Sequence, residues 1–171
     1  SKNTKGIDIV RQLIAAGVDV NPQLNFHRPG RGGNSARFTD YLLTTGATPL
    51  LRAAITHDHD SMRALLEAGA LVDLPNVMGV TPLMAAAGLG VRNINFGANR
   101  SPDFEGDPTV QAQAIQSIEI LLAAGADINA RVTDTKSRTA RIARPTSVTD
   151  TDGQTALFSA ASRGWIDVTR F

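Results

Sequence analysis

The amino-acid sequence predicts an all-α fold made of stacked helix-turn-helix units. One phrase, Thr-Pro-Leu-x-x-Ala-Ala, begins at Thr48 and returns 33 residues later at Thr81, and a weaker copy begins at Thr155. A second phrase, Leu-(Leu/Ile)-x-Ala-Gly, ends at Gly17, Gly69 and Gly125 and interleaves with the first. A fixed period of this length is typical of a stacked repeat array.

The first phrase predicts the first helix of each unit. Proline after threonine suits the first helical position, where no N–H is needed, and the threonine hydroxyl can cap the exposed N–H groups. The paired alanines are small enough to let neighbouring helices approach closely. We therefore expect first helices at Pro49–Thr56, Pro82–Leu89 and Ala156–Ser162.

The second phrase predicts the second helix of each unit. Complete second helices are expected at Asp60–Glu67 and Pro108–Ala123, with Asp107 as the cap of the latter, and partial ones at 7–14 and 165–171. Each glycine of the phrase follows a helix, where a left-handed residue is needed. The two leucine pairs of this phrase should be buried between units, and each side chain should stabilise the fold by about 2 kcal/mol. They are Leu65, Leu66, Leu121 and Leu122.

Both phrases carry a resemblance to the ankyrin-repeat family. The carrying segments are Gly79-Val80-Thr81-Pro82-Leu83-Met84-Ala85-Ala86 and Leu121-Leu122-Ala123-Ala124-Gly125-Ala126-Asp127-Ile128-Asn129. The segment Thr-Pro-Leu-Met-Ala-Ala-Ala-Gly-Leu-Gly, which begins at Thr81, is similar to sequences of bacterial members of the family. Several of these members are exported, so a periplasmic or secreted location is favoured over a cytoplasmic one. The chain departs from the family where a histidine is common. Apolar contact between units should replace that histidine's hydrogen bond at Leu51, Met84 and Phe158.

Under this resemblance, residues 1–171 form one array with long insertions. The expected parts are a partial repeat (7–23), an inserted finger (24–44), a repeat (45–76), a repeat with a helix–helix insertion at 91–107 (77–130), a second inserted finger (131–152) and a partial repeat (153–171). The first and second fingers exceed the plain turn by 19 and 18 residues. Because the array opens and closes inside a repeat, further repeats or a neighbouring chain are expected to cover both ends.

Composition narrows the functional classes. The net charge is +1 and the pI 8.2, below the value of about 9 that marks nucleic-acid binding domains. The absence of cysteine excludes disulfides, thiolate metal sites and a cysteine nucleophile. No apolar run approaches the ~18 residues of a membrane span.

Three segments could carry a site of their own. His57-Asp58-His59-Asp60 contains metal-ligand side chains, but the residue types favour a structural role: His57 tolerates positive φ, and Asp58 or Asp60 caps a helix. Arg28-Pro29-Gly30-Arg31-Gly32-Gly33 lacks the aromatics that nucleic-acid binding needs. Asn34–Leu43 reads as a short amphipathic helix that packs on the scaffold rather than on a partner. No catalytic constellation or cofactor motif is found.

The resemblance therefore implies a non-catalytic protein-binding module, and the alternative is a structural spacer or docking segment of a larger enzyme or assembly. The first finger carries a charge of +2, and the segment 130–151 of the second finger carries +3, against −1 for the helix–helix insertion. An acidic partner surface is therefore expected. Besides Ala85 and Ser159, the expected partner-binding residues are Arg28, Arg31, Arg37, Arg52, Ile55, Thr56, Met78, Val80, Leu89, Lys136, Arg138, Arg141, Arg144, Gln154 and Arg163.

Overall fold

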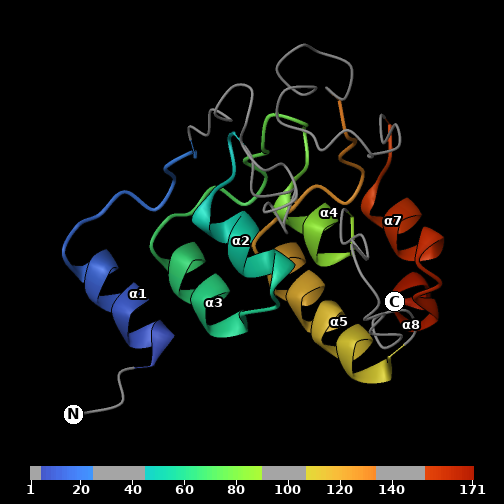
Figure 1. The fold of residues 1–171 in the computed structure, drawn as a ribbon, viewed down its shortest axis with the longest axis horizontal. Coiled ribbons are helices and arrows are strands. Elements are labelled where there is room, and N and C mark those ends of the chain that lie inside the picture. Colours follow the sequence, from blue (N-terminus) through green and yellow to red (C-terminus); the bar gives the residue numbers. More distant parts are fainter. Residues whose placement is uncertain (1–4, 25–44, 90–106, 134–152) are drawn as a thin grey trace, which may run out of the picture.

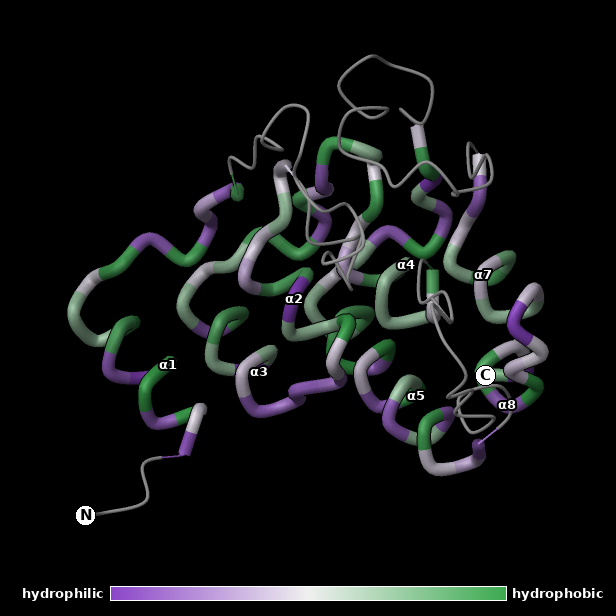
Figure 2. The backbone as a smooth tube through the Cα atoms, in the orientation of Figure 1, coloured by the Kyte–Doolittle hydropathy of each residue, from purple (hydrophilic) through white to green (hydrophobic). Residues whose placement is uncertain are grey.

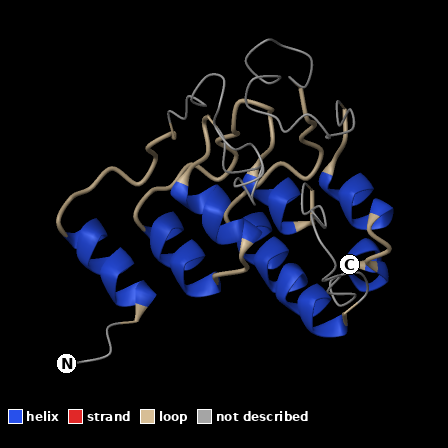
Figure 3. Cartoon of the chain, viewed as in Figure 1, coloured by secondary structure: helices blue, strands red, loops and turns tan. Residues whose placement is uncertain are grey.

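The computed structural model describes residues 5–24, 45–89, 107–133 and 153–171. Regular structure in these ranges is helical throughout, with no strand among them, which confirms the all-α prediction (Figure 3). The helices are α1 (Gly6–Ala15), α2 (Pro49–Ile55), α3 (His59–Glu67), α4 (Pro82–Ala86), α5 (Pro108–Ala123), α7 (Ala156–Ser162) and α8 (Ile166–Arg170).

The helices lie in two rows (Figure 1). In one row α2 contacts α4 and α4 contacts α7; in the other, α1 contacts α3, α3 contacts α5 and α5 contacts α8. The rows are joined by contacts of α2 with α3, of α4 with α5 and of α7 with α8. Three helix pairs thus stand side by side, and α1 extends the second row alone.

Helix starts follow the predicted capping chemistry. The hydroxyls of Thr48, Thr81 and Thr155 accept hydrogen bonds from the backbone N–H three residues on, at 3.1, 3.4 and 3.2 Å. Asp58 caps α3 in the same manner, and Asp107 caps α5 by accepting from the N–H of Thr109, two residues on, at 2.7 Å. Satisfying these otherwise unpaired N–H groups is typically worth about 1 kcal/mol for each cap.

The C-terminal ends of the helices agree only in part with those predicted from the sequence. Gly17, Gly69 and Gly125 have φ of 81°, 91° and 89°, as predicted for residues that terminate a helix. The predicted extent of α4 to Leu89 was wrong: the helix ends at Ala86, because Gly88 takes φ 87° and turns the chain. The helix α2 also ends one residue early, at Ile55, and α3 starts one residue early, at His59.

The turns between units close with one shared pattern of backbone hydrogen bonds. Asn76 N–H donates to Val80 O, and Gly79 N–H donates to Asn76 O. Leu24 repeats this pattern with Ala47 and Gly46, and Val132 repeats it with Gln154 and Gly153. Two residues lie between the bonded positions 76 and 79, against 21 between 24 and 46 and 20 between 132 and 153. The long segments therefore enter and leave the described chain at positions equivalent to the ends of a two-residue turn.

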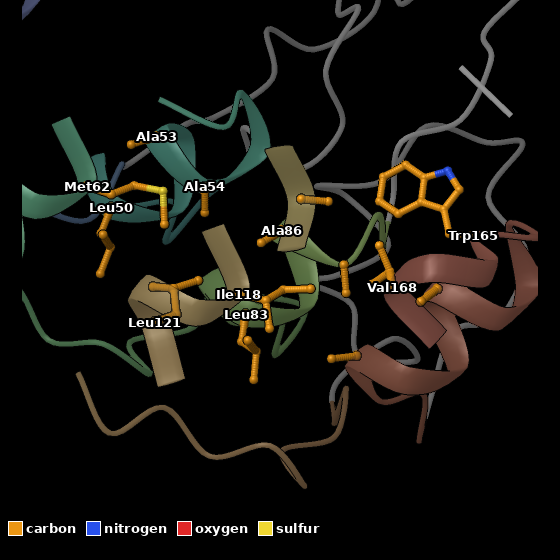
Figure 4. Close-up of a cluster of buried hydrophobic side chains, with 14 of the residues drawn as sticks. Leu50, Ala53, Ala54, Met62, Leu83, Ala86, Ile118, Leu121, Trp165 and Val168 are labelled. Carbon is orange, nitrogen blue, oxygen red and sulfur yellow. The ribbon is translucent and has the colours of Figure 1, made fainter. Parts of the chain in front are cut away.

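The main core lies between the two rows of helices. It includes Leu50, Met62, Leu83, Ile118 and Leu121, and Trp165 and Val168 extend it to the C-terminal pair (Figure 4). Burial of the predicted leucine pairs is confirmed for Leu65 and Leu121, whereas Leu66 and Leu122 are only partly buried at its edge.

A second core forms where the turns meet the first helices. Leu51 and Met84 are buried there together with Met78, Val80 and Val132. Leu51 and Met84 therefore make the apolar contact that was predicted for these two positions. At the third, Phe158 is mostly exposed, because no described helix lies beyond α7 in the row of α2, α4 and α7.

Both ends of the two rows expose large apolar side chains, as expected. On α1, hydrophobic and hydrophilic residues alternate along the helix (Figure 2), and Ile9 and Leu13 are exposed. At the other end the exposed residues are Leu157, Phe158, Ile166 and Phe171.

Candidate interaction surface

The surface expected from the sequence begins on α2. Arg52 and Thr56 are exposed, and Ile55 is half-buried between them. The Thr56 hydroxyl donates to Arg52 O at 3.1 Å or to Ala53 O at 3.3 Å. Because this bond holds the hydroxyl against its own helix, the methyl group of Thr56 remains available for packing.

At the C-terminal pair, the expected surface residues have structural partners. Arg163 is half-buried, its Nε donates to Gly88 O at 2.6 Å, and its guanidinium lies 5.7 Å from the ring centre of Trp165. This arrangement ties the end of α7 to the turn after α4. Gln154, also half-buried, accepts a bond from Val132 N–H through its backbone oxygen.

Three expected contact residues belong to the core instead. Met78, Val80 and Leu89 are 3%, 2% and 5% exposed in the second core, and Ala85 and Ser159 are also buried. The middle turn packs against its neighbours, so the side chains expected to reach a partner face inwards. We therefore remove these five residues from the interaction surface.

The cationic residues expected on the fingers lie outside the described residues. They are Arg28, Arg31 and Arg37 of the first finger and Lys136, Arg138, Arg141 and Arg144 of the second. The segment 34–43 and the insertion 91–106 also lie outside them.

The histidine cluster adopts the predicted structural role. His57 has φ 52°, and Asp58 accepts bonds from the backbone N–H and the hydroxyl of Ser61, at 3.2 and 2.7 Å. In the described part of the chain, no group of three or more His, Cys, Asp or Glu side chains is placed to hold a metal ion.

The two imidazoles converge on a serine of the neighbouring helix pair, a contact that the sequence did not reveal. His57 Nδ1 and His59 Nε2 each lie 3.0 Å from Ser117 Oγ on α5, and His59 Nε2 is also 3.0 Å from Gln113 O. The only sequence signal is that Ser117 shares one helix face with the apolar residues Ala114, Ile118 and Leu121.

This cluster has the residue types of a nucleophile and a base but not the access. Ser117 is fully buried, and its hydroxyl donates to Gln113 O at 3.1 Å within the helix. Burial, and to a lesser degree the charge of His59, lowers the pKa of His57 from 6.5 to about 4. A neutral His57 therefore joins α5 to the turn before α3.

Comparisons with known proteins add no assignment: no model of a known protein family matches the chain, and no curated protein matches it. The described helices include none with the length and apolarity needed to cross a bilayer.

Proposed function

We propose that the chain is an ankyrin-repeat solenoid that binds another protein and carries no catalytic site of its own. The repeat assignment is supported by threonine caps, left-handed glycines and turn hydrogen bonds that recur in equivalent places. In such arrays each unit contacts only its neighbours, and insertions in the units are often the binding elements.

The observation that carries this function is the shared closure of the three turns. Two of them open into segments of 20 and 21 residues without altering the hydrogen bonds at their base. Long segments on a packed scaffold are usually functional, because ordering them otherwise only costs entropy. Their excess of arginine and lysine favours an acidic partner surface.

The test begins with affinity capture by the whole chain and uses charge variants to qualify each retained protein. The triple variant R138A/R141A/R144A should weaken binding of a true partner by tenfold or more at low salt. The matched control R11A/R63A/R170A removes the same charge from exposed positions elsewhere and should bind within twofold of the wild type. Equal affinity of all three chains would contradict the proposed binding role of the basic fingers.

A second candidate, a docking segment of a larger enzyme or assembly, is favoured by the apolar side chains at both ends. Leu13, Ile166 and Phe171 are each about half exposed or more. Further units or a neighbouring chain would cover them. A purified chain that stays monomeric and melts cooperatively at high temperature would count against this candidate.

A further inference from the structure

Among the described helices, the two rows leave one position open beside α1. Each of α3, α5 and α8 contacts a helix of the other row, namely α2, α4 and α7. α1 contacts α3, and the place beside it in the first row holds a groove. This groove has a volume of about 380 Å³ and is lined by residues of α1, α2, α3 and the segment after α1.

The α2 wall of the groove carries the face that is covered in the other first helices. It consists of the first, fourth, fifth and eighth residues after the capping threonine: Pro49, Arg52, Ala53 and Thr56. In α4 the same four positions are all buried, and in α7 they are buried except for half-buried Arg163, which bonds to the turn after α4. This face therefore meets the preceding helix of the row.

The α1 wall shows the same mismatch. Val10 and Leu13 line the groove and correspond, by distance from the following glycine, to Met62 and Leu65 of α3. Both of those side chains are buried, whereas Leu13 is 52% exposed. Covering a hydrophobic side chain that is exposed to this degree would stabilise the complex with the covering helix.

The chemistry of the occupant can be derived from the opposite end of the row. The second, third and sixth residues after the capping threonine are buried in α2 and α4, but in α7 Leu157, Phe158 and Ala161 are exposed. These positions therefore face the following helix. In α2 they are Leu50, Leu51 and Ala54.

We propose that the groove binds a short amphipathic helix of a partner protein, with leucine, leucine or methionine, and alanine on its inward face. Bound there, the partner helix continues the row of α7, α4 and α2 and covers Leu13. Helix-in-groove recognition of this kind depends on apolar anchors at helical spacing. Asp19 and Asp58 line the groove against one cationic side chain, Arg52. The remaining negative charge favours a cationic residue at the edge of the partner helix.

This proposal deepens the binding function proposed above and shares Arg52 and Thr56 with its surface. The two proposals can be refuted independently. The groove is tested at Leu13, whereas binding by the fingers is tested at Arg138, Arg141 and Arg144. Unchanged peptide binding in L13N would therefore leave the result for the charge variants of the fingers unaffected.

The probe is a fluorescein-labelled, side-chain-stapled peptide with the sequence of residues 47–58, because an isolated helix this short is unstable in water. Fluorescence anisotropy with the whole chain should show saturable binding with a Kd on the order of 10–100 μM. A peptide carrying serine at the positions of Leu50 and Leu51 should bind at least tenfold more weakly. Equal binding of the two peptides would overturn the proposal.

The protein variants locate the binding. L13N should weaken binding at least tenfold, and T56K, on the other wall, should do the same. L71N is the matched control, since Leu71 is 57% exposed and lies outside the groove lining, and it should bind as the wild type does. Wild-type affinity in both L13N and T56K would contradict the proposal, as would a wild-type dimer that L13N makes monomeric, because a second copy would then occupy the groove.

Discussion

His57 Nδ1 lies 3.0 Å from Ser117 Oγ, although 60 residues separate them in the sequence. The contact joins the turn between α2 and α3 to the middle of α5, in the next helix pair. His59 reaches the same hydroxyl from the start of α3. Because the half-buried imidazole of His57 contacts this hydroxyl, its protonation is coupled to the packing of one helix pair on the next.

Acid should therefore weaken the fold through His57. Its pKa is lowered from 6.5 to about 4, so the unfolded chain binds a proton that the folded chain does not. The free energy of unfolding is therefore highest above pH 6.5, where His57 is neutral in both states. It decreases as the pH falls from 6.5 towards 4, with a slope approaching about 1.4 kcal/mol per pH unit. Urea unfolding at pH 7, 6 and 5 measures this slope.

The variant H57N isolates the contribution of this histidine. Asparagine tolerates the positive φ of this position and does not titrate. Below pH 6.5 the slope should be smaller in H57N than in the wild type. An identical pH dependence in both chains would show that another group is responsible.

Two glycines with the same backbone conformation should respond differently to alanine. Gly79 and Gly153 have φ of 75° and 77°. A Cβ at Gly79 would lie 2.8 Å from Thr133 N, whereas at Gly153 no atom of the described residues lies within 4 Å. G153A should cost about 1 kcal/mol for the left-handed conformation alone, and G79A should cost at least about 2 kcal/mol because the two turns must also separate. Equal losses in urea unfolding would contradict the close approach of the turns.

Arg163 should stabilise the C-terminal pair through its bond to Gly88 and its position over Trp165. R163A removes the bond to Gly88 O and the guanidinium over Trp165, and we expect a loss of about 1–3 kcal/mol. R163K should recover less than half, because an ammonium lacks the planar geometry. Trp165 is the chain's one tryptophan, so its fluorescence reports unfolding at this end. Full recovery in R163K would show that charge alone matters.

Local signals in the sequence predicted the helices well. Helix ends are specified by only a few neighbouring residues. The signals are threonine and aspartate caps, proline at the first helical position and glycine after the leucines. The bounds of α5 and α7 were predicted without error. The end of α4 was missed because Ala87 continues the helical pattern, and only the conformation of Gly88 ends it.

The interaction surface was harder to predict because it depends on contacts between units. Met78 and Val80 sit in a turn, where exposed side chains are usual, but successive turns pack closely enough to bury them. The partnership of His57 with Ser117 depends on distant residues in the same way. The groove beside α1 became visible only when equivalent positions on three first helices could be compared for exposure.

The most direct test of the account shortens a turn. Deleting residues 134–151 leaves Thr133 and Asp152 between Val132 and Gly153, as Val77 and Met78 lie between Asn76 and Gly79. If long segments are insertions into an unchanged stack, the shortened chain keeps its helical circular dichroism. Its free energy of unfolding, measured by urea titration, should equal that of the wild type or exceed it by up to about 2 kcal/mol, because a shorter loop costs less entropy to close. Loss of cooperative unfolding in this variant would contradict the account.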